Sequence, residues 1–230
     1  MMTIPEQLKQ RYNKSHLSYS SVKQALGDMA QFDRYMKGEI KYKSDALEFG
    51  TLYDMLLFER TKAMEKYFVI NKNKILNECS SKTKSSKSPH LTNEYKSVRA
   101  DLEQQAQLKG MALVSHEDWQ MANDMIDRLA TCGLLDTYLA GEYQVGFLEE
   151  LNGIQVKGFL DCLGDGFISG IKDFYWVVQE KTYPYLPALV KCSDETIFVG
   201  EMKFNDAVNR IRTFLREDYD PTKDYLKYEV

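Results

Sequence analysis

Two apolar segments on either side of an Asn-Gly pair constrain this chain most strongly. The segments "EYQVGFLEEL" and "IQVKGFLDCL" have the composition of β-strands, and Asn152-Gly153 between them is the dipeptide that favours a tight hairpin turn. Two further short apolar segments, "FYWVVQEK" and "ALVKCS", precede a closing helical pattern that ends near Leu215. Residues 141–230 are therefore predicted to hold a sheet core and a C-terminal helix.

The preceding part, residues 1–140, is predicted to be mainly helical. "LSYSSVKQALGDMAQFDRYMKGE" predicts one helix that stops near Gly38, and "SDALEFGTLYDMLLFERTKAMEKY" predicts a second one. Gly50 inside the second helix suggests close approach by another backbone. "YFVI" predicts a strand, and Ser115 is the expected cap of a later helix. The serine- and lysine-rich residues 71–93 lack periodicity and predict a mobile loop.

Helices followed by a meander and a last helix predict an α+β or α/β core with a helical N-terminal layer. A chain of 230 residues can bury such a core in one domain, so residues 1–230 are predicted to form a single domain.

Composition removes several classes of protein. The net charge of −4, from 30 basic and 34 acidic residues, argues against a wholly basic nucleic-acid coat. The four cysteines form no CxxC pair, which excludes a common zinc-ribbon pattern and disfavours a disulfide framework. No apolar run approaches the roughly 18 residues that span a bilayer. We expect a soluble, cytoplasmic protein without a membrane partner.

The order of several segments resembles that of a known family. "LSYSSVKQAL", "ALEFGTLYDMLLFE", "KYFVI", "LVSHEDWQMANDMIDRL" and "GIQVKGFLDCL" follow one another as in phage and prophage exonucleases. The chain resembles the PD-(D/E)xK nuclease superfamily from about Leu17 to about Leu215, in the branch of exodeoxyribonuclease VIII and lambda-exonuclease-like enzymes. The resemblance implies a restriction-endonuclease-like core with a mixed central sheet flanked by helices.

The resemblance also implies an activity and a set of site residues. It implies an exodeoxyribonuclease that hydrolyses duplex DNA ends with Mg²⁺ or Mn²⁺, in recombination or DNA processing, beside a single-strand annealing protein, and it is compatible with a homo-oligomer. Asp161 matches the family's first Asp, Glu142 matches the preceding Glu, and Lys172 is a candidate for the catalytic lysine. Carboxylate oxygens are the ligands that Mg²⁺ prefers, and a lysine stabilises developing charge.

Departures from the family pattern leave alternatives open. Asp54 replaces the family's His and is either a metal ligand or an ordinary exposed helix residue; Glu142 is either a ligand or a solvated strand-edge charge. Gly170 stands two residues before Lys172, where the family has an essential carboxylate, and the family's next polar and helical stretch is missing. Either the protein has lost its chemistry, or the 230 residues join across an omitted segment, in which case Lys172 is a loop residue. We favour the omitted segment, because loss of a core helix would expose the sheet face built by "FYWVV".

Two further readings follow. Lys82, Lys84 and Lys87 in the predicted loop are candidate DNA-binding residues, since clustered lysines release counterions from a phosphate backbone, although a solvated loop has the same composition. The rival functions are a catalytically inactive nuclease fold that binds DNA or protein, and a helical interaction module unrelated to nucleases. The second rival would lack a carboxylate cluster around Asp161.

Overall fold

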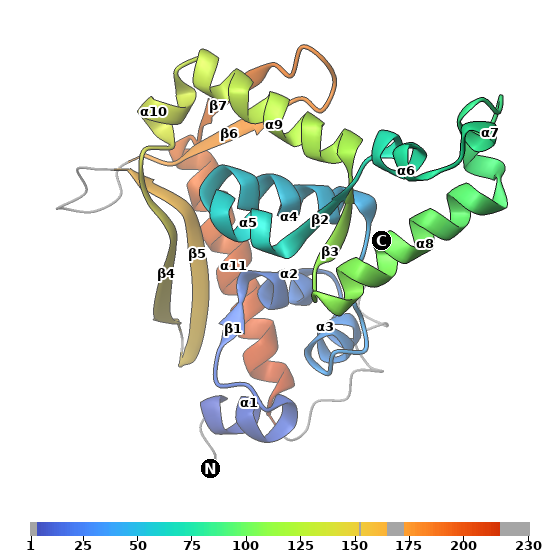
Figure 1. Ribbon diagram of the computed structural model, residues 1–230. Helices are drawn as coiled ribbons and strands as arrows, with labels where there is room; N and C mark the ends of the chain where they lie inside the picture. Colours follow the sequence, from blue (N-terminus) through green and yellow to red (C-terminus); the bar gives the residue numbers. More distant parts are fainter. Residues whose placement is uncertain (1–3, 152, 165–172, 217–230) are drawn as a thin grey trace, which may run out of the picture. The chain divides into compact units, whose positions relative to one another are not determined.

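The computed structural model of the protein describes residues 4–151, 153–164 and 173–216 (Figure 1). Their contacts divide the chain into two compact units, and each unit is described by itself. The first unit comprises Met1–Tyr42, Thr137–Val177 and Leu189–Val230, and the second comprises Lys43–Asp136 and Val178–Ala188. This division does not test whether the chain is a single domain, which stays a prediction.

The first unit contains a mixed sheet with the strand order β1-β5-β4. β1 pairs with β5 in parallel, at Leu17↔Val156, and β4 pairs with β5 antiparallel along its whole length. β4 begins at the predicted boundary, residue 141. The helices and strands in this part are α1 (Ile4–Tyr12), β1 (Leu17–Ser18), α2 (Tyr19–Gly27), α3 (Met29–Met36), β4 (Gly141–Leu151), β5 (Ile154–Gly164) and α11 (Asp194–Phe214). The short helix α10 (Leu134–Tyr138) begins in the second unit and ends in the first.

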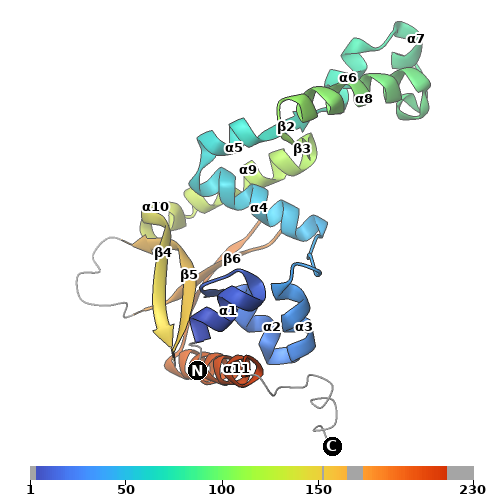
Figure 2. The same ribbon diagram turned by 90° about the horizontal axis from the view of Figure 1, so that it is seen from below.

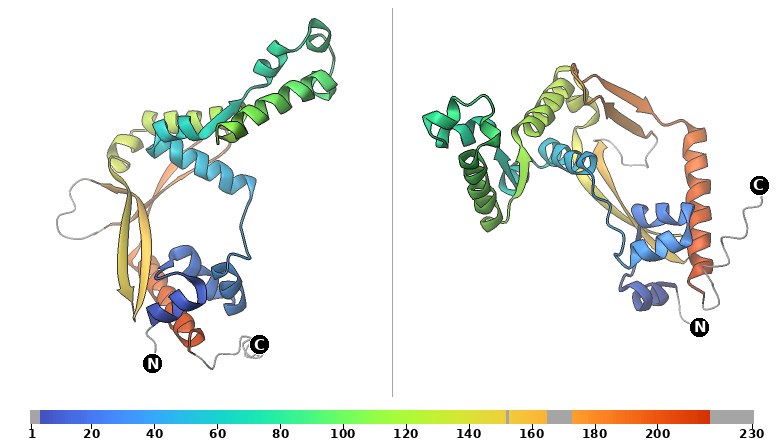
Figure 3. Two further views of the ribbon diagram at one scale, coloured as in Figure 1. Left: turned by 60° about the horizontal axis from the view of Figure 1, so that its bottom comes forward. Right: turned by 90° about the vertical axis from the view of Figure 1, so that its right-hand side faces the viewer.

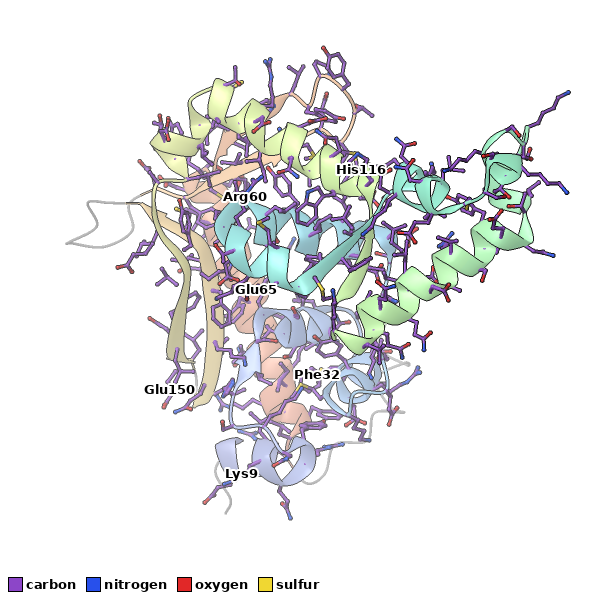
Figure 4. The ribbon with its side chains drawn as sticks, in the orientation of Figure 1. Lys9, Phe32, Arg60, Glu65, His116 and Glu150 are labelled. Carbon is purple, nitrogen blue, oxygen red and sulfur yellow. The ribbon has the colours of Figure 1, made fainter. Side chains whose placement is uncertain are left out.

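The core of the first unit lies between the N-terminal helices and the second half of α11 (Figure 3). Phe32, which Figure 4 labels, meets the rings of Tyr12 and Phe214 edge to face, with centroids 6.1 and 6.0 Å apart. Ile154 and Val156 add the buried face of β5 to the same cluster. The end of the hairpin at which β5 begins is thus held by helices from both ends of the chain.

The second unit contains a small parallel sheet, β2-β3, and helices on its sides. Ser115 caps the helix after β3 by accepting a hydrogen bond from the Asp118 N–H at 3.0 Å, as predicted. The elements are α4 (Asp45–Phe58), α5 (Arg60–Lys66), β2 (Tyr67–Ile70), α6 (Lys72–Glu78), α7 (Ser81–Lys84), η1 (Pro89–Leu91), α8 (Asn93–Leu108), β3 (Ala112–Ser115) and α9 (His116–Thr131).

Several local predictions are wrong. The first predicted helix is interrupted at Asp28, whose backbone is extended and whose carboxylate caps α3 by accepting from the Ala30 N–H at 2.9 Å. The second is interrupted at Glu59, between α4 and α5. Within the described part of the second unit, a Cβ on Gly50 would meet nothing within 4 Å, so no other backbone of that unit approaches it closely. Residues 71–93 form α6, α7 and η1 instead of a mobile loop, because Ile75 and the residues near it pack on α8.

The remaining strands are β6 (Tyr175–Gln179) and β7 (Pro187–Lys191), which pair with each other. Within the described residues β6 does not join β4 and β5, so the prediction of one sheet carrying all three is wrong. A short connection brings β7 beside β6, so β7 pairs along one edge of β6. The protein nevertheless has the predicted α+β fold with a small mixed sheet and N-terminal helices.

In the second unit, the Gln179 side-chain amide joins three segments. Its Oε1 accepts a hydrogen bond from the Tyr53 hydroxyl at 2.8 Å, and its Nε2 donates to the carbonyl oxygens of Met125 at 2.9 Å and Tyr185 at 3.0 Å. Burial raises the pKa of the Tyr53 hydroxyl, and the nearby Asp54 charge raises it further. The hydroxyl therefore stays protonated and remains a donor.

Replacing Tyr53 by Phe should test this connection. The change leaves Gln179 Oε1 without its donor, and we expect the free energy of unfolding to fall by about 1–2 kcal/mol. Tyr67→Phe is the matched control, because within the described residues the Tyr67 hydroxyl has no hydrogen bond and the loss should stay under about 0.5 kcal/mol. Urea unfolding of both variants gives the comparison, and equal losses would contradict it.

The β4–β5 hairpin depends on glycines at close approaches. A Cβ on Gly141 would lie 2.1 Å from the Leu163 carbonyl oxygen, which is backbone and cannot move alone. Farther along, the Phe159 ring lies over Gly146, 3.2 Å from where its Cβ would be, and the Phe147 ring lies over Gly158. Strand pairing next to the Glu142 position therefore requires glycine at residue 141.

We expect Gly141→Ala to lower the free energy of unfolding by about 1–3 kcal/mol, because an overpacked backbone contact must be relieved by displacement. Gly146→Ala should cost less than about 1 kcal/mol, since the exposed Phe159 ring can rotate away. Thermal or urea unfolding measures both. A Gly141→Ala protein as stable as Gly146→Ala would contradict the close approach.

Candidate active site

The register of β4 and β5 places Glu142 and Asp161 on the same face of the hairpin. Glu142 is opposite Leu163, and Asp161 is two residues before Leu163 on β5. Directly opposed residues share a face, and so do residues two apart along a strand. Glu142 and Asp161 are therefore diagonal neighbours, about 7 Å apart at the backbone. The structure brings these two predicted carboxylates together.

Gln144 is a member of this site that the sequence reasoning missed. It lies between Tyr143↔Cys162 and Val145↔Leu160, directly across from Asp161, and its Nε2 donates to Asp161 Oδ1 at 3.3 Å. Its backbone has a φ of 53°. The sequence did hold a signal for it: a two-residue turn at Asn152-Gly153 sets the register that puts residue 144 opposite residue 161. The amide restrains one oxygen of the carboxylate.

The carboxylate face points away from the core of the first unit. The other face of the hairpin carries Ile154 and Val156 into that core. Asp161 and Glu142 are exposed, and their apolar neighbours on the same face, Leu148 and Phe159, are 59% and 63% exposed. A ligand can therefore reach both carboxylates from solvent.

One edge of β5 is open beside Asp161. β4 covers the opposite edge throughout, whereas β1 pairs with β5 only at Val156 and Lys157. Within residues 4–151, 153–164 and 173–216, no strand pairs with the 158–164 stretch on this side. Unpaired N–H and C=O groups there can accept another strand.

Other predicted site residues are placed less completely. Lys172 and Gly170 lie outside the described residues, so their roles stay predictions. Asp54 is an exposed residue of α4 in the second compact unit, whereas Asp161 belongs to the first. A metal ion shared by Asp54 and Asp161 therefore stays a prediction. His116, which Figure 4 labels, is an exposed residue at the start of α9.

The two carboxylates fit part of a magnesium site. Magnesium is commonly held by one or two carboxylates together with water and substrate phosphate oxygens, so Glu142 and Asp161 match the required ligand type. In the described part of the chain, no group of three or more His, Cys, Asp or Glu side chains is arranged to hold a metal ion. A magnesium ion bound by this pair would need further ligands from outside it.

The lysines of the predicted loop divide into two sets. Lys72 forms an ion pair with Glu117 at 2.6 Å, and Lys74 lies over the Phe68 ring at 5.2 Å. Lys82, Lys84 and Lys87 are exposed on and just after α7. The first set is used within the fold, and the second set is presented to solvent.

Comparisons with known proteins identify the class of domain. A family described as "PDDEXK-like domain of unknown function" matches residues 18–185. The crystal structure of a "Putative exonuclease" from Eubacterium rectale has a similar fold, with a TM-score of 0.57, 13% identity, and coverage of 96% of this chain and 88% of that chain. No curated protein matches. No helix among the described residues is long and apolar enough to cross a membrane.

The family match identifies a nuclease-type domain of the PD-(D/E)xK superfamily, and the fold agrees with it. The chain belongs to the PDDEXK-like family whose profile matches most of its length. A helical interaction module unrelated to nucleases is thereby excluded, and the predicted superfamily is confirmed.

Direct metal titration should test the pair. Mn²⁺ binding followed by electron paramagnetic resonance should weaken by about tenfold, or ~1.4 kcal/mol, in Glu142→Gln and in Asp161→Asn. Glu149→Gln is the matched control, because this substitution removes one negative charge from the same strand as Glu142. Glu149 lies on the opposite face of the hairpin, across from Val156. If the Glu149 variant loses as much affinity as the others, the assignment of the face is wrong.

Proposed function

We propose that the protein is a phage-type exodeoxyribonuclease that hydrolyses phosphodiester bonds from duplex DNA ends with Mg²⁺. The observation that carries the proposal is the placement of Glu142 and Asp161 on one exposed face, beside the open edge of β5, in a chain of the PDDEXK-like family. Paired carboxylates exposed to solvent suit a polymer substrate, because the scissile phosphate must approach from outside.

The roles of the residues follow from their chemistry. Glu142 and Asp161 would hold the metal ion, and Gln144 would keep the Asp161 carboxylate oriented. When bound, the ion polarises water and neutralises charge on the scissile phosphate. Lys172 stays a candidate for the lysine that stabilises the developing charge.

The rest of the catalytic set would arrive on a strand that pairs with the open edge of β5. Exposed apolar side chains on β6 and just before it support a missing neighbour: Phe174, Trp176 and Val178 are 37%, 45% and 47% exposed. A longer gene product with an Asp/Glu-x-Lys strand and a helix after Gly164 would supply both the ligands and the cover. In that product Lys172 would be a loop residue.

A second candidate function is a catalytically inactive nuclease fold that binds DNA or a protein. The small number of metal ligands favours this function. The described residues bring only two carboxylates together, and Gly170 stands where the family has a further essential carboxylate. For the active form we place the protein in the cytoplasm of the host cell, in recombination beside a single-strand annealing protein, as a monomer or homo-oligomer.

The test is release of nucleotides from a linear duplex. A protein of these 230 residues should degrade the duplex poorly or not at all in Mg²⁺, whereas a longer product with the restored motif should degrade it and stop on addition of EDTA. Asp161→Asn should abolish this activity with little change in folding, because it keeps the shape and removes the charge. Glu149→Gln should retain it. A closed circular duplex should stay intact, because the proposed reaction starts from ends.

Three results would count against the proposal. Robust activity that survives Asp161→Asn would show that the site is elsewhere. Cleavage of the closed circle as fast as the linear duplex would indicate an endonuclease. A longer product that binds DNA but never cleaves it would favour the inactive binding module.

A further inference from the structure

In the second unit, α6, α7, η1 and α8 form a helical arm with its own small core (Figure 2). Ile75 and Cys79 of the first half pack against Tyr95 and Leu102 of α8. Partly buried apolar side chains of β2 join this cluster at the base of the arm. The tip, residues 80–91, is therefore carried on a folded support.

One carboxylate holds the tip in place. Glu94, in the first turn of α8, accepts hydrogen bonds from the Ser80 N–H at 2.8 Å, from the Ser80 hydroxyl at 2.7 Å and from the Thr83 hydroxyl. The Thr83 bond, and then the two from Ser80, lower the pKa of Glu94. The nearby Lys84 charge lowers this pKa further. The hydrogen bonds from Ser80 and Thr83 fix α7 on α8.

The tip carries unbalanced positive charge. Residues 80–91 contain three lysines and no aspartate or glutamate, in a chain whose net charge is −4. Lys82, Lys84 and Lys87 are all exposed, and among the described residues none of them forms an ion pair with a carboxylate. Lys84 also donates to the Asn77 carbonyl oxygen at 3.0 Å. Exposed lysines on a folded support that form no ion pair with a carboxylate favour an anionic ligand.

We propose that the tip of this arm binds the sugar–phosphate backbone of DNA without reading its sequence. Lysine ammonium groups gain free energy by releasing counterions from phosphates, and serine hydroxyls, present here at residues 81, 85, 86 and 88, also contact phosphates. The choice of DNA as the polymer rests on the proposed function. The arm would hold the substrate through contacts that need neither metal nor cleavage.

The experiment measures binding instead of activity. Fluorescence anisotropy of a labelled duplex, in EDTA and in the Asp161→Asn background, is followed over a salt series. The triple variant Lys82→Gln, Lys84→Gln and Lys87→Gln should weaken binding at least about tenfold at low salt, and should reduce the slope of log K against log salt by about 2–3. A separate control measures binding of the parent and the triple variant to vesicles that contain an anionic lipid.

The matched control is Lys9→Gln, Lys23→Gln and Lys203→Gln, three exposed lysines of the first unit that make the same change in net charge. It should change affinity less than about twofold and the slope by less than about 1. Circular dichroism melting of both triple variants should match the parent, because exposed lysines contribute little to folding.

Three outcomes would overturn the inference. Equal loss in both triple variants would show that net charge alone drives binding. Absence of salt-dependent duplex binding by the parent protein would show that the arm does not bind DNA. Tip lysines that matter for anionic vesicles but not for DNA would assign the arm to a lipid surface. A protein that binds DNA through the tip but never cleaves it would support the DNA-binding inference and contradict the exonuclease proposal. Failure of one proposal can therefore be distinguished from failure of the other.

Discussion

The pairing register of β4 and β5 is the constraint on which the site depends. The two-residue connection between Leu151 and Ile154 fixes this register, and all pairs from Leu151↔Ile154 back to Gly141↔Gly164 keep it without a shift. A slip of one residue would exchange the two faces of one strand. Ile154 and Val156 would then leave the core, so the buried end of the hairpin protects the geometry of the exposed end. Gly141 contributes by allowing the backbones to meet beside Glu142.

Sequence reasoning found the features that local chemistry determines. The pairing of β4 with β5 and the Ser115 cap are determined by neighbouring residues, and both agree with the prediction. The fold class followed from the order of helical and strand patterns, and the superfamily followed from the resemblance of several ordered segments to a known family. It missed the interruption at Asp28, because a capping side chain competes with an apolar pattern that continues through it. It missed the helices of the arm because each short helix buries too few side chains to give a visible helical periodicity of apolar residues. In α6, for example, the buried residue is Ile75. Gln144 was missed because its partner is seventeen residues away.

The carboxylate pair and the arm place two kinds of chemistry on separately described units. Glu142 and Asp161 belong to the first unit, and the lysine tip belongs to the second. Metal ligation needs oxygen atoms held at defined positions, which a hairpin fixed by glycine contacts can provide. Backbone binding tolerates wide variation in position, which suits lysines on a short helix. The local architecture of each unit thus matches the precision that its proposed task requires.

The open edge of β5 has a consequence for handling the protein. Unpaired strand edges flanked by apolar side chains tend to join edge to edge with other copies, and natural proteins limit this by placing a charge on the strand. Asp161 stands in the middle of the unpaired stretch, between Leu160 and Cys162. Two copies joined antiparallel about this residue would bring like charges together, so the carboxylate that we assign to the metal also acts as a gatekeeper against aggregation. The neutral asparagine variant loses that protection and is best kept dilute.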